Sequence, residues 1–443
     1  MQVVNVDEVV ASAKVNRFHW LLLICCTFMI MCDGYDLFMY GTIVPSLMKE
    51  WNISAVVAGT LNSYALVGMM IGALALGPAA DRFGRKRVIL VSCAVFCVFT
   101  GLAGFSQGPL MFGTCRFLAG LGLGGIMPNT VALVTEYAPA SLRSTLVAVM
   151  FSGHPFGGVV ASLVGMWLVP TAGWRAVLFV GAIPILAIPL FAWWVPDSLQ
   201  FSVARRRTDE LALVLRKLTG RDYAATEEFM ISRPVEHGFP VGRLFAEHRG
   251  VSTILFWLSF FMCLLTMYGL TTWLPKLMQT AGFAVASSLG SLLALNLGAI
   301  VGAIIGSSIA DRLGGKPVLV VSFLIAALSL VAMSQRPPIG WLYVLLFLAG
   351  ATTTGTQITS NAYVSQYYPT EMRSTGIGWA LGVGRLGGIL GPTLGGLLVA
   401  GHLSLTADFL AFALPSVVSA VAMGLVQQRF AAWRPGLERE AAM

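Results

Sequence analysis

Two aspartates, Asp33 and Asp36, stand three residues apart in a long apolar stretch near the start of the chain. If this stretch is helical, they share one helix face, and Tyr40 extends that face by one turn. Two neighbouring carboxylates repel one another and burial favours the uncharged form, so at least one of them would bind and release a proton readily. The alternatives are a structural ion pair with a basic residue, or a position near water. We interpret the pair as a proton-coupling site, without deciding which aspartate carries the proton.

Two arginines, Arg116 and Arg385, interrupt other apolar stretches. A guanidinium group can bind a carboxylate through two parallel hydrogen bonds. Arg116 could therefore bind a carboxylate ligand, or it could hold the two aspartates. Arg385 lies among glycines, which let backbones approach closely, so it could anchor a ligand or bond to backbone carbonyl groups. The predicted ligand-binding residues are Arg116, Arg385, Tyr40, His154 and Trp379.

A histidine and a glutamate are further candidates for chemistry. His154 precedes Pro155. Its imidazole could relay protons near neutral pH, or it could form a hydrogen bond where the proline kinks a helix. Glu136 lies near the end of another apolar stretch, and an ion pair with Arg143, seven residues on, could contribute to a gate.

Charged residues also cluster in the segment 77–87, which reads Gly-Pro-Ala-Ala-Asp-Arg-Phe-Gly-Arg-Lys-Arg. A carboxylate at a helix end can pair with basic groups and with the N-terminus of a neighbouring helix. A shorter copy, Asp311-Arg312-Leu313-Gly314-Gly315-Lys316, occurs 230 residues later. Positive charge alone would not require the aspartates, so we interpret both copies as latches rather than only as topology signals. The predicted gating residues are Asp81, Arg82, Arg85, Lys86, Glu136, Arg143, Asp311, Arg312 and Arg373.

The apolar stretches around these residues are long enough to serve as their scaffold. The 443 residues are 57% hydrophobic and only 11% charged, whereas about a quarter of the residues in a soluble domain are charged. Because water cannot solvate so apolar a surface, lipid must surround it. A span across a bilayer needs about 20 apolar residues. Such runs occur near 18–44, 56–79, 87–106, 110–134, 145–168, 175–195, 251–274, 286–309, 317–334, 340–362, 374–400 and 405–427.

The positions of the basic residues predict an orientation. With the N-terminus inside, four of the 28 Lys and Arg fall in outside loops and two fall within spans, which leaves 22 inside. Both termini are then cytoplasmic. The one long polar segment, 196–250, is a cytoplasmic linker between an N-terminal half at 1–195 and a C-terminal half at 251–443. Within the linker, 204–218 could form an amphipathic surface helix.

An internal repeat relates the two halves. Shifted by 230 residues, the sequence aligns with itself without a gap over about 120 positions, so that Ala80-Asp81-Arg82 falls on Ala310-Asp311-Arg312. Such a repeat predicts two parallel six-helix halves related by an axis along the membrane normal. Scaffold symmetry does not explain four charges, because Asp33, Asp36, Arg116 and Arg385 fall opposite Cys263, Thr266, Leu346 and Pro155.

The segment 77–87 resembles the G-x-x-x-D-R-x-G-R-K loop of the major facilitator superfamily. Asp33-Gly34-Tyr35-Asp36 matches the D-G-[FY]-D sequence of its aromatic acid:proton symporter family. The continuation to Gly41 is most similar to the benzoate-transporting branch of that family. His154 departs from the family pattern, which more often has a residue there that does not ionise. The resemblance covers essentially the whole chain and includes Arg116 with Gly120, Gly122 and Gly124, Glu136-Tyr137 with Arg143, and Gly384-Arg385-Leu386-Gly387-Gly388.

This resemblance implies an all-α membrane protein with twelve transmembrane helices in the bacterial inner membrane. It further implies a symporter that imports a small aromatic carboxylate, such as benzoate or a hydroxybenzoate, with a proton by alternating access. We expect no enzyme activity, no cofactor, no metal and no nucleic-acid partner, and we expect a monomer in membrane lipid. Two other functions stay open: transport or export of another organic anion such as a muconate, and a membrane sensor that binds without transport.

The residues agree with the expected absence of enzyme chemistry. Gly122-x-Gly124 lies inside an apolar run rather than after a strand, so it does not resemble a nucleotide-binding loop. No spacing of Cys, His and carboxylates is typical of a metal site. The seven cysteines all lie in apolar stretches, where we expect them to pack as small buried side chains.

Overall fold

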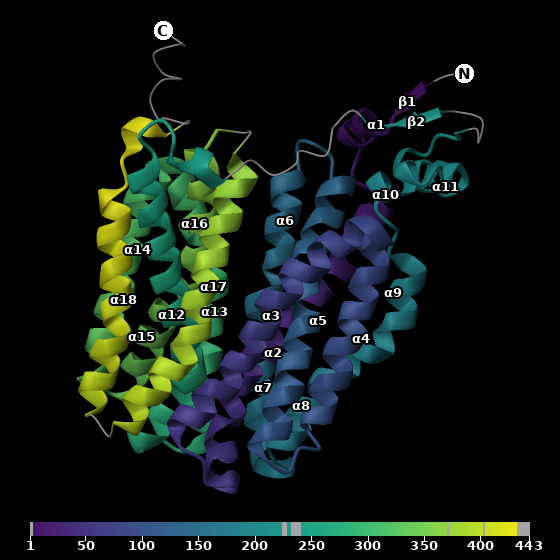
Figure 1. Cartoon of the computed structure of the whole chain (residues 1–443). Coiled ribbons are helices and arrows are strands. Elements are labelled where there is room, and N and C mark those ends of the chain that lie inside the picture. Colours follow the sequence, from purple (N-terminus) through teal and green to yellow (C-terminus); the bar gives the residue numbers. More distant parts are fainter. Residues whose placement is uncertain are drawn as a thin grey trace. The chain divides into compact units, whose positions relative to one another are not determined.

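The computed structural model describes residues 3–223, 228–231, 241–335, 337–369, 372–401 and 404–431. Within these residues, twelve helical stretches are long and apolar enough to cross a membrane, as predicted (Figure 1). The first six consist of α2 (Arg17–Trp51), α3 (Ala55–Phe83), α4 (Arg85–Ala103), α5 (Pro109–Tyr137), α6 (Arg143–Phe151) with α7 (Gly153–Ala172), and α8 (Trp174–Ala182) with the 3-10 helix η1 (Ile183–Ala187) and α9 (Ile188–Trp194).

The other six spans follow the linker. They consist of α12 (Gly250–Thr280), α13 (Val285–Leu313), α14 (Gly315–Met333), α15 (Ile339–Thr352) with α16 (Thr354–Tyr367), α17 (Arg373–Ala400) and α18 (Leu405–Leu425). Several helices extend past the predicted apolar runs. The first run was predicted to end at residue 44, but α2 continues to Trp51 through Lys49 and Glu50, because polar residues can prolong a helix beyond the hydrocarbon layer.

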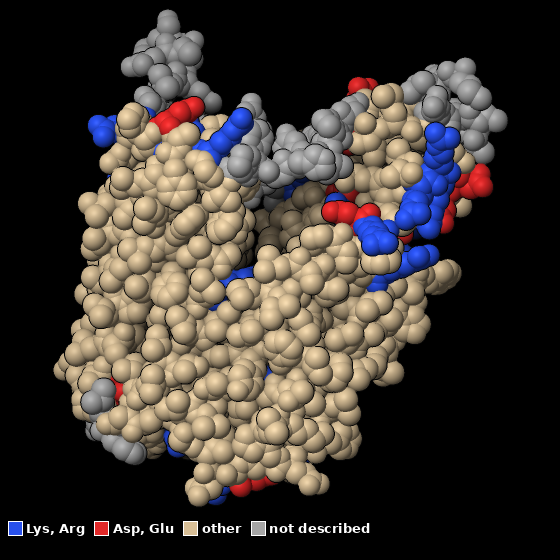
Figure 2. Space-filling view, viewed as in Figure 1, with Lys and Arg blue, Asp and Glu red and all other residues tan. Residues whose placement is uncertain are grey.

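The flanks of these helices carry apolar side chains that no protein covers. Leu110, Leu186 and Trp193 are 86%, 77% and 77% exposed. Figure 2 shows that charged side chains on the face in view gather near the helix ends and are nearly absent between them. Exposing this much apolar surface to water would be unfavourable, so these flanks are suited to contact with the interior of a membrane.

Short elements outside the spans join the N-terminal segment to the linker. Strand β1 (Val3–Asn5) pairs in parallel with β2 (Glu228–Met230), and α1 (Val6–Ser12) follows β1 directly. The predicted amphipathic helix is present as α11 (Thr208–Thr219), with three leucines of one face buried. The all-α prediction thus holds for the spans, while the two short strands are an addition. The remaining elements are α10 (Leu199–Ala204), η2 (Val241–Phe245) and η3 (Gln428–Phe430).

The internal repeat is also present in the contacts between helices. A Cβ atom added at Gly68 would lie 2.1 Å from the carbonyl oxygen of Phe117. At the positions 230 residues later, a Cβ atom at Gly298 would lie 1.9 Å from the carbonyl oxygen of Phe347. Only glycine permits these two close helix crossings, so the repeat preserves a packing contact as well as a sequence pattern.

The internal contacts divide the chain into two compact units. The first contains residues 1–37, 67–157 and 175–236, and the second contains 38–66, 158–174 and 237–443. The division passes through α2, α3 and α7, so these units differ from the predicted halves. The boundaries of those halves at 195 and 250 stay a prediction.

Candidate functional site

The carboxylate of Asp36 binds the guanidinium group of Arg116 inside the first unit. Nη1 of Arg116, on α5, lies 2.6 Å from Oδ1 and 2.7 Å from Oδ2 of Asp36, on α2. Both side chains are 0% exposed. Thr100 of α4 donates a hydrogen bond from Oγ1 to Oδ1 of Asp36 at 3.2 Å. Of the two roles considered for Arg116, holding an aspartate is the one present in this structure.

Asp33, one helical turn before Asp36, has different surroundings. Nε2 of His154, on α7, lies 4.0 Å from Oδ2 of Asp33. The two helices can approach because Gly34 has no side chain: a Cβ atom there would lie 2.0 Å from the carbonyl oxygen of His154. One aspartate therefore faces a permanently charged guanidinium group, and the other faces an imidazole that can gain and lose a proton.

Arg385 lies on α17 in the second unit and is partly buried. The glycines around it pack α17 against α12. A Cβ atom at Gly387 would lie 2.0 Å from the carbonyl oxygen of Phe261, and one at Gly391 would lie 2.5 Å from that of Leu265. Among the residues that the structure describes, the Arg385 side chain makes no ion pair and no hydrogen bond. The alternative role, bonding to backbone carbonyl groups, is therefore not seen there, and the role of Arg385 as a ligand anchor stays a prediction.

The two aromatic candidates differ in accessibility. Tyr40 is fully buried, and its hydroxyl donates a hydrogen bond to the carbonyl oxygen of Ala58 at 2.6 Å, which ties α2 to α3. Trp379 on α17 is 44% exposed and stacks on Trp257 of α12, with ring centroids 5.6 Å apart. Trp379 therefore offers the more accessible ring surface, whereas the hydroxyl of Tyr40 already has a backbone partner.

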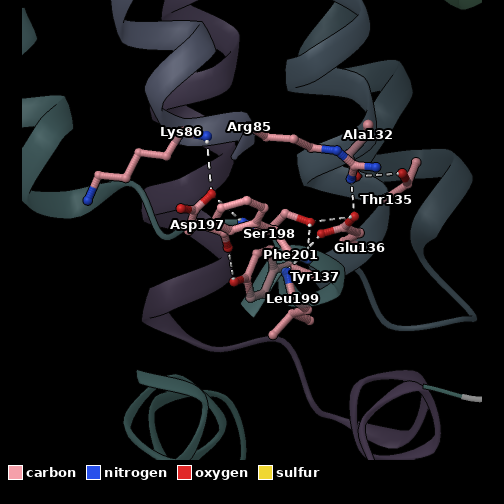
Figure 3. A network of polar contacts seen from close by, with 10 residues as sticks. All are labelled: Arg85, Lys86, Ala132, Thr135, Glu136, Tyr137, Asp197, Ser198, Leu199 and Phe201. Atoms are coloured by element: carbon pink, nitrogen blue, oxygen red, sulfur yellow. Dashed lines mark hydrogen bonds and ion pairs between the residues drawn. The ribbon is translucent and has the colours of Figure 1, made fainter. Parts of the chain in front are cut away.

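A polar network joins the ends of α4, α5 and α10 (Figure 3). At its centre, Glu136 of α5 forms an ion pair with Arg85 of α4. Ser198 Oγ donates to Oε1 of Glu136 at 3.0 Å, and the backbone N–H of Leu199 donates to Oε2 at 3.0 Å. The structure thus pairs Glu136 with Arg85, whereas the sequence suggested a pair with Arg143. The backbone amide of the first residue of α10 donates to the same carboxylate.

Asp197 extends the same network to the start of α4 (Figure 3). Its Oδ1 lies 3.5 Å from the backbone nitrogen of Lys86, in the first turn of α4. Gly84, with a φ of +92°, makes room for it, since a Cβ atom there would lie 2.8 Å from Oδ2 of Asp197. The hydroxyl of Tyr137 donates to the Asp197 carbonyl oxygen at 2.6 Å. A carboxylate at a helix N-terminus was the role expected for Asp81, and here Asp197 has it.

The other predicted gating residues lie at helix ends and are exposed. Asp81 and Asp311 end α3 and α13, and no ion pair of either is seen within the described ranges. Arg143, by contrast, lines a cavity of about 180 Å³ together with Arg85, Glu136 and Asp7 of α1. The exposed gating candidates are Asp81, Arg82, Asp311, Arg312 and Arg373.

Sequence reasoning did not single out Asp197, Ser198 or Thr100. Asp197 and Ser198 follow the sixth span and immediately precede α10, a pattern that is typical of a helix N-cap. That pattern could have identified them as a helix start, although not as part of the network. Thr100 carries no such signal, because a threonine in an apolar helix usually bonds to its own backbone.

Among the described residues, no group of three or more His, Cys, Asp or Glu side chains is arranged so that it could hold a metal ion. All seven cysteines are free and buried, as their apolar surroundings predicted.

Comparisons with known proteins agree on one family. The model of the Major Facilitator Superfamily matches residues 26–306 and 286–441. The benzoate transport protein of Acinetobacter baylyi is 41% identical over 435 residues, which cover 96% of this chain and 93% of that protein. The gallate transporter of Pseudomonas putida is 34% identical, with 95% and 94% covered. The 4-hydroxybenzoate transporter PcaK of Acinetobacter baylyi is 32% identical, with 95% and 93% covered.

Solved structures support the same fold at lower identity. The inward open conformation of the xylose transporter XylE from E. coli superposes with a TM-score of 0.75 at 19% identity, covering 92% of this chain and 96% of that one. A bacterial homologue of the human lysosomal transporter Spinster gives a TM-score of 0.70 at 15% identity, covering 96% of this chain and 100% of that one.

Proposed function

Because the chain belongs to the major facilitator superfamily, we propose that it imports a small aromatic carboxylate, such as benzoate or a hydroxybenzoate, together with a proton. The protein does so by alternating access across a bacterial inner membrane, as a monomer in lipid with both termini in the cytoplasm. The substrate class is supported by relatives whose names specify transport of benzoate, gallate and 4-hydroxybenzoate.

The buried ion pair of Asp36 and Arg116 is the observation that carries this proposal. Arg116 is the cation that a substrate carboxylate needs, but ionised Asp36 already occupies it. A proton on Asp36 removes this competition, because a neutral carboxyl group holds a guanidinium group far less strongly. The substrate carboxylate binds Arg116 only when Asp36 is protonated, and this condition couples the two flows.

Asp33 and His154 supply the route for the proton. Their side chains lie 4.0 Å apart, and Asp33 is one turn from Asp36 on α2. An imidazole and a carboxylate can share a proton near neutral pH, so this pair loads and unloads Asp36. In the second half, Arg385 offers a further cation for the substrate, and Trp379 offers a ring surface.

In this proposal, charged residues at the helix ends act as the gates. The network of Arg85, Glu136 and Asp197 fixes α4 and α10 to α5. Asp81 and Asp311, exposed here, form and break ion pairs as the cycle proceeds. Their repeat-related positions place one such group in each half.

The test uses the purified protein in liposomes with labelled benzoate. The unaltered protein should accumulate benzoate when the lumen is alkaline, and it should also exchange benzoate without a pH gradient. Asp36→Asn should keep exchange, since the amide leaves Arg116 available, but it should lose proton-driven accumulation. Asp33→Asn should lose accumulation as well. Asp222→Asn, at an exposed carboxylate paired with Arg216 outside the spans, is the matched control and should behave normally.

Three outcomes would contradict the proposal. Normal pH-driven accumulation in both aspartate variants would remove the proton-coupling role. Exchange of muconate but not of benzoate or 4-hydroxybenzoate would change the substrate class. Binding without any exchange would indicate a sensor rather than a transporter.

A further inference from the structure

Thr100 is a fully buried polar residue in the spans that contacts the ion pair directly. It lies on α4, is 0% exposed, and donates from Oγ1 to Oδ1 of Asp36 at 3.2 Å. The same Oδ1 accepts from Arg116 at 2.6 Å. Asp36 therefore receives hydrogen bonds from two helices, α4 and α5, and only the one from α5 carries a charge.

The packing around Thr100 fixes the direction of its hydroxyl. A Cβ atom at Gly181, on α8, would lie 3.1 Å from the Thr100 methyl carbon Cγ2 and 3.1 Å from Cε1 of Tyr35. Tyr35 is itself held, because its hydroxyl donates to the carbonyl oxygen of Val177 at 2.8 Å. A β-branched side chain has few rotamers, so packing the methyl against α8 turns the hydroxyl towards Asp36.

We propose that Thr100 is a positioning residue that sets the pH at which Asp36 takes up a proton and releases Arg116. A hydroxyl that donates to a carboxylate stabilises the ionised form. Without this donor, the protonated form of Asp36 persists to higher pH. The effect of Thr100 on the protonation of Asp36 does not depend on the proposed function. Its effect on substrate binding does rest on that proposed function.

The other ionisable groups in and around this site come from four helices, the helix of Asp36 included. Arg116 faces it from α5, and Cys97 faces it from α4. Tyr35 and Asp33 lie on its own helix, and His154 of α7 faces Asp33. All of these groups are unchanged when only the Thr100 hydroxyl is removed, so a change in the titration of Asp36 reports on that hydroxyl.

Infrared difference spectroscopy of the full-length protein, titrated without substrate, measures the protonation of Asp36 directly. The carboxyl band is assigned by its loss in Asp36→Asn. Thr100→Val has nearly the same shape but lacks the hydroxyl, so its carboxyl band should titrate at a higher pH than that of the unaltered protein. Thr100→Ser keeps the hydroxyl and should titrate like the unaltered protein. Thr100→Ala also lacks the hydroxyl and should shift in the same direction as Thr100→Val.

Benzoate binding measured across the same pH range gives the second readout. The highest pH at which benzoate still binds should be higher in Thr100→Val, in parallel with the infrared titration. In Thr100→Ser it should equal that of the unaltered protein. An unshifted carboxyl band in both Thr100→Val and Thr100→Ala would overturn the role of Thr100, as would an equal shift in Thr100→Ser. If benzoate binds none of the proteins but the band shifts as expected, the substrate assignment fails and the role of Thr100 stands.

Discussion

An aspartate and an arginine that are both fully buried lose their hydration, which costs several kcal/mol for each ion. Their attraction offsets this cost only while both are present. Asp36 and Arg116 meet this condition, with two contacts of 2.6 and 2.7 Å and a hydrogen bond from Thr100. Replacing a buried ion pair by apolar residues of similar volume is often neutral or stabilising, so we attribute these charges to transport rather than to stability.

This reasoning predicts the stability of charge-removing variants. Arg116→Leu leaves ionised Asp36 without its cation and should lower the free energy of unfolding by about 3–5 kcal/mol. The double variant Asp36→Leu/Arg116→Leu should recover most of that loss but should not transport. Thermal unfolding in detergent measures the first effect, and liposome exchange measures the second. A double variant that is no more stable than Arg116→Leu would contradict the argument.

A second prediction concerns Arg385. If its guanidinium group binds the substrate carboxylate, Arg385→Ala should raise the half-saturating benzoate concentration about tenfold or more, because it removes charge-assisted hydrogen bonds. Arg385→Lys keeps the charge without the planar guanidinium group. Its half-saturating benzoate concentration should lie between those of the unaltered protein and Arg385→Ala. Lys49→Ala removes a positive charge at an exposed site and serves as the control. An unchanged half-saturating benzoate concentration in Arg385→Ala would indicate that Arg385 has a structural role.

Individual residues could be predicted where their type conflicts with their surroundings. Asp33, Asp36 and Arg116 are conspicuous because charge is costly in an apolar span. Asp197 was missed because it lies in the polar linker, where a carboxylate is ordinary. The pairing of Glu136 with Arg85 was also missed, since it joins residues 51 apart through the folding of α4 against α5.

At the scale of elements, the N-terminal segment and the linker form one structure beside the spans. Figure 1 shows β1 and α1 next to β2 and α11. Asn16 ties them together: Nδ2 donates to the carbonyl oxygens of Lys217 and Leu218 at 2.8 and 2.9 Å, and Oδ1 accepts from Phe18 N–H at 3.0 Å. The one side chain caps the end of α11 and the start of α2.

We expect Asn16→Ala to loosen this structure without unfolding the spans. The variant loses the hydrogen bonds of Nδ2 to α11 and those that Oδ1 accepts from Phe18 and His19, and removal of an N-cap alone costs about 1 kcal/mol. Amide hydrogen exchange, followed by mass spectrometry, should become faster in the last turn of α11 and in both strands. Ser12→Ala is the matched control, because within the described ranges the Ser12 hydroxyl bonds only inside α1, to the carbonyl oxygens of Glu8 at 2.8 Å and Val9 at 3.3 Å. Equal protection in the two variants would contradict this prediction.

The spans could be predicted because each one needs a long apolar run, and composition alone reveals such runs. The strands β1 and β2 could not be predicted in the same way. Three residues are too few to show the alternation of a strand. Their pairing also depends on the linker returning to the N-terminal segment, which local sequence does not encode.

For the whole molecule, the repeat is preserved in some contacts and lost in others. The hydroxyl of Tyr137 donates to the carbonyl oxygen of residue 197, and that of Tyr367 donates to the carbonyl oxygen of residue 427, at the same spacing. The charged network is not repeated. Arg85, Glu136 and Asp197 correspond to Gly315, Gln366 and Gln427, so the first half alone carries these ionisable groups.

Alternating access requires that contacts between segments of the two halves separate during the cycle. In the second unit, Ser63 of α3 meets Thr393 of α17, with hydroxyl oxygens 2.9 Å apart. A disulfide between Ser63→Cys and Thr393→Cys is within reach at this spacing. Oxidation of the double variant should stop benzoate exchange, and a reductant should restore it.

The single cysteine variants, treated with the same oxidant, are the controls and should keep exchanging benzoate. The seven native cysteines are buried, so they should not interfere. Continued exchange by protein that mass spectrometry shows to be fully cross-linked would mean that α3 and α17 do not separate there.

The parallel pairing of β1 with β2 also has a consequence for biosynthesis. Val3 pairs with Glu228, so the ribosome makes the first strand 225 residues before its partner. At 5–20 residues per second, that interval is roughly 10 to 45 s. The helices of the first half enter the membrane during this time, while β1 has no strand to pair with. Because β1 has only three residues, it has little chance of pairing wrongly with another strand in this interval. The pairing of β1 with β2 therefore forms after the first half has been synthesised, when β2 becomes available.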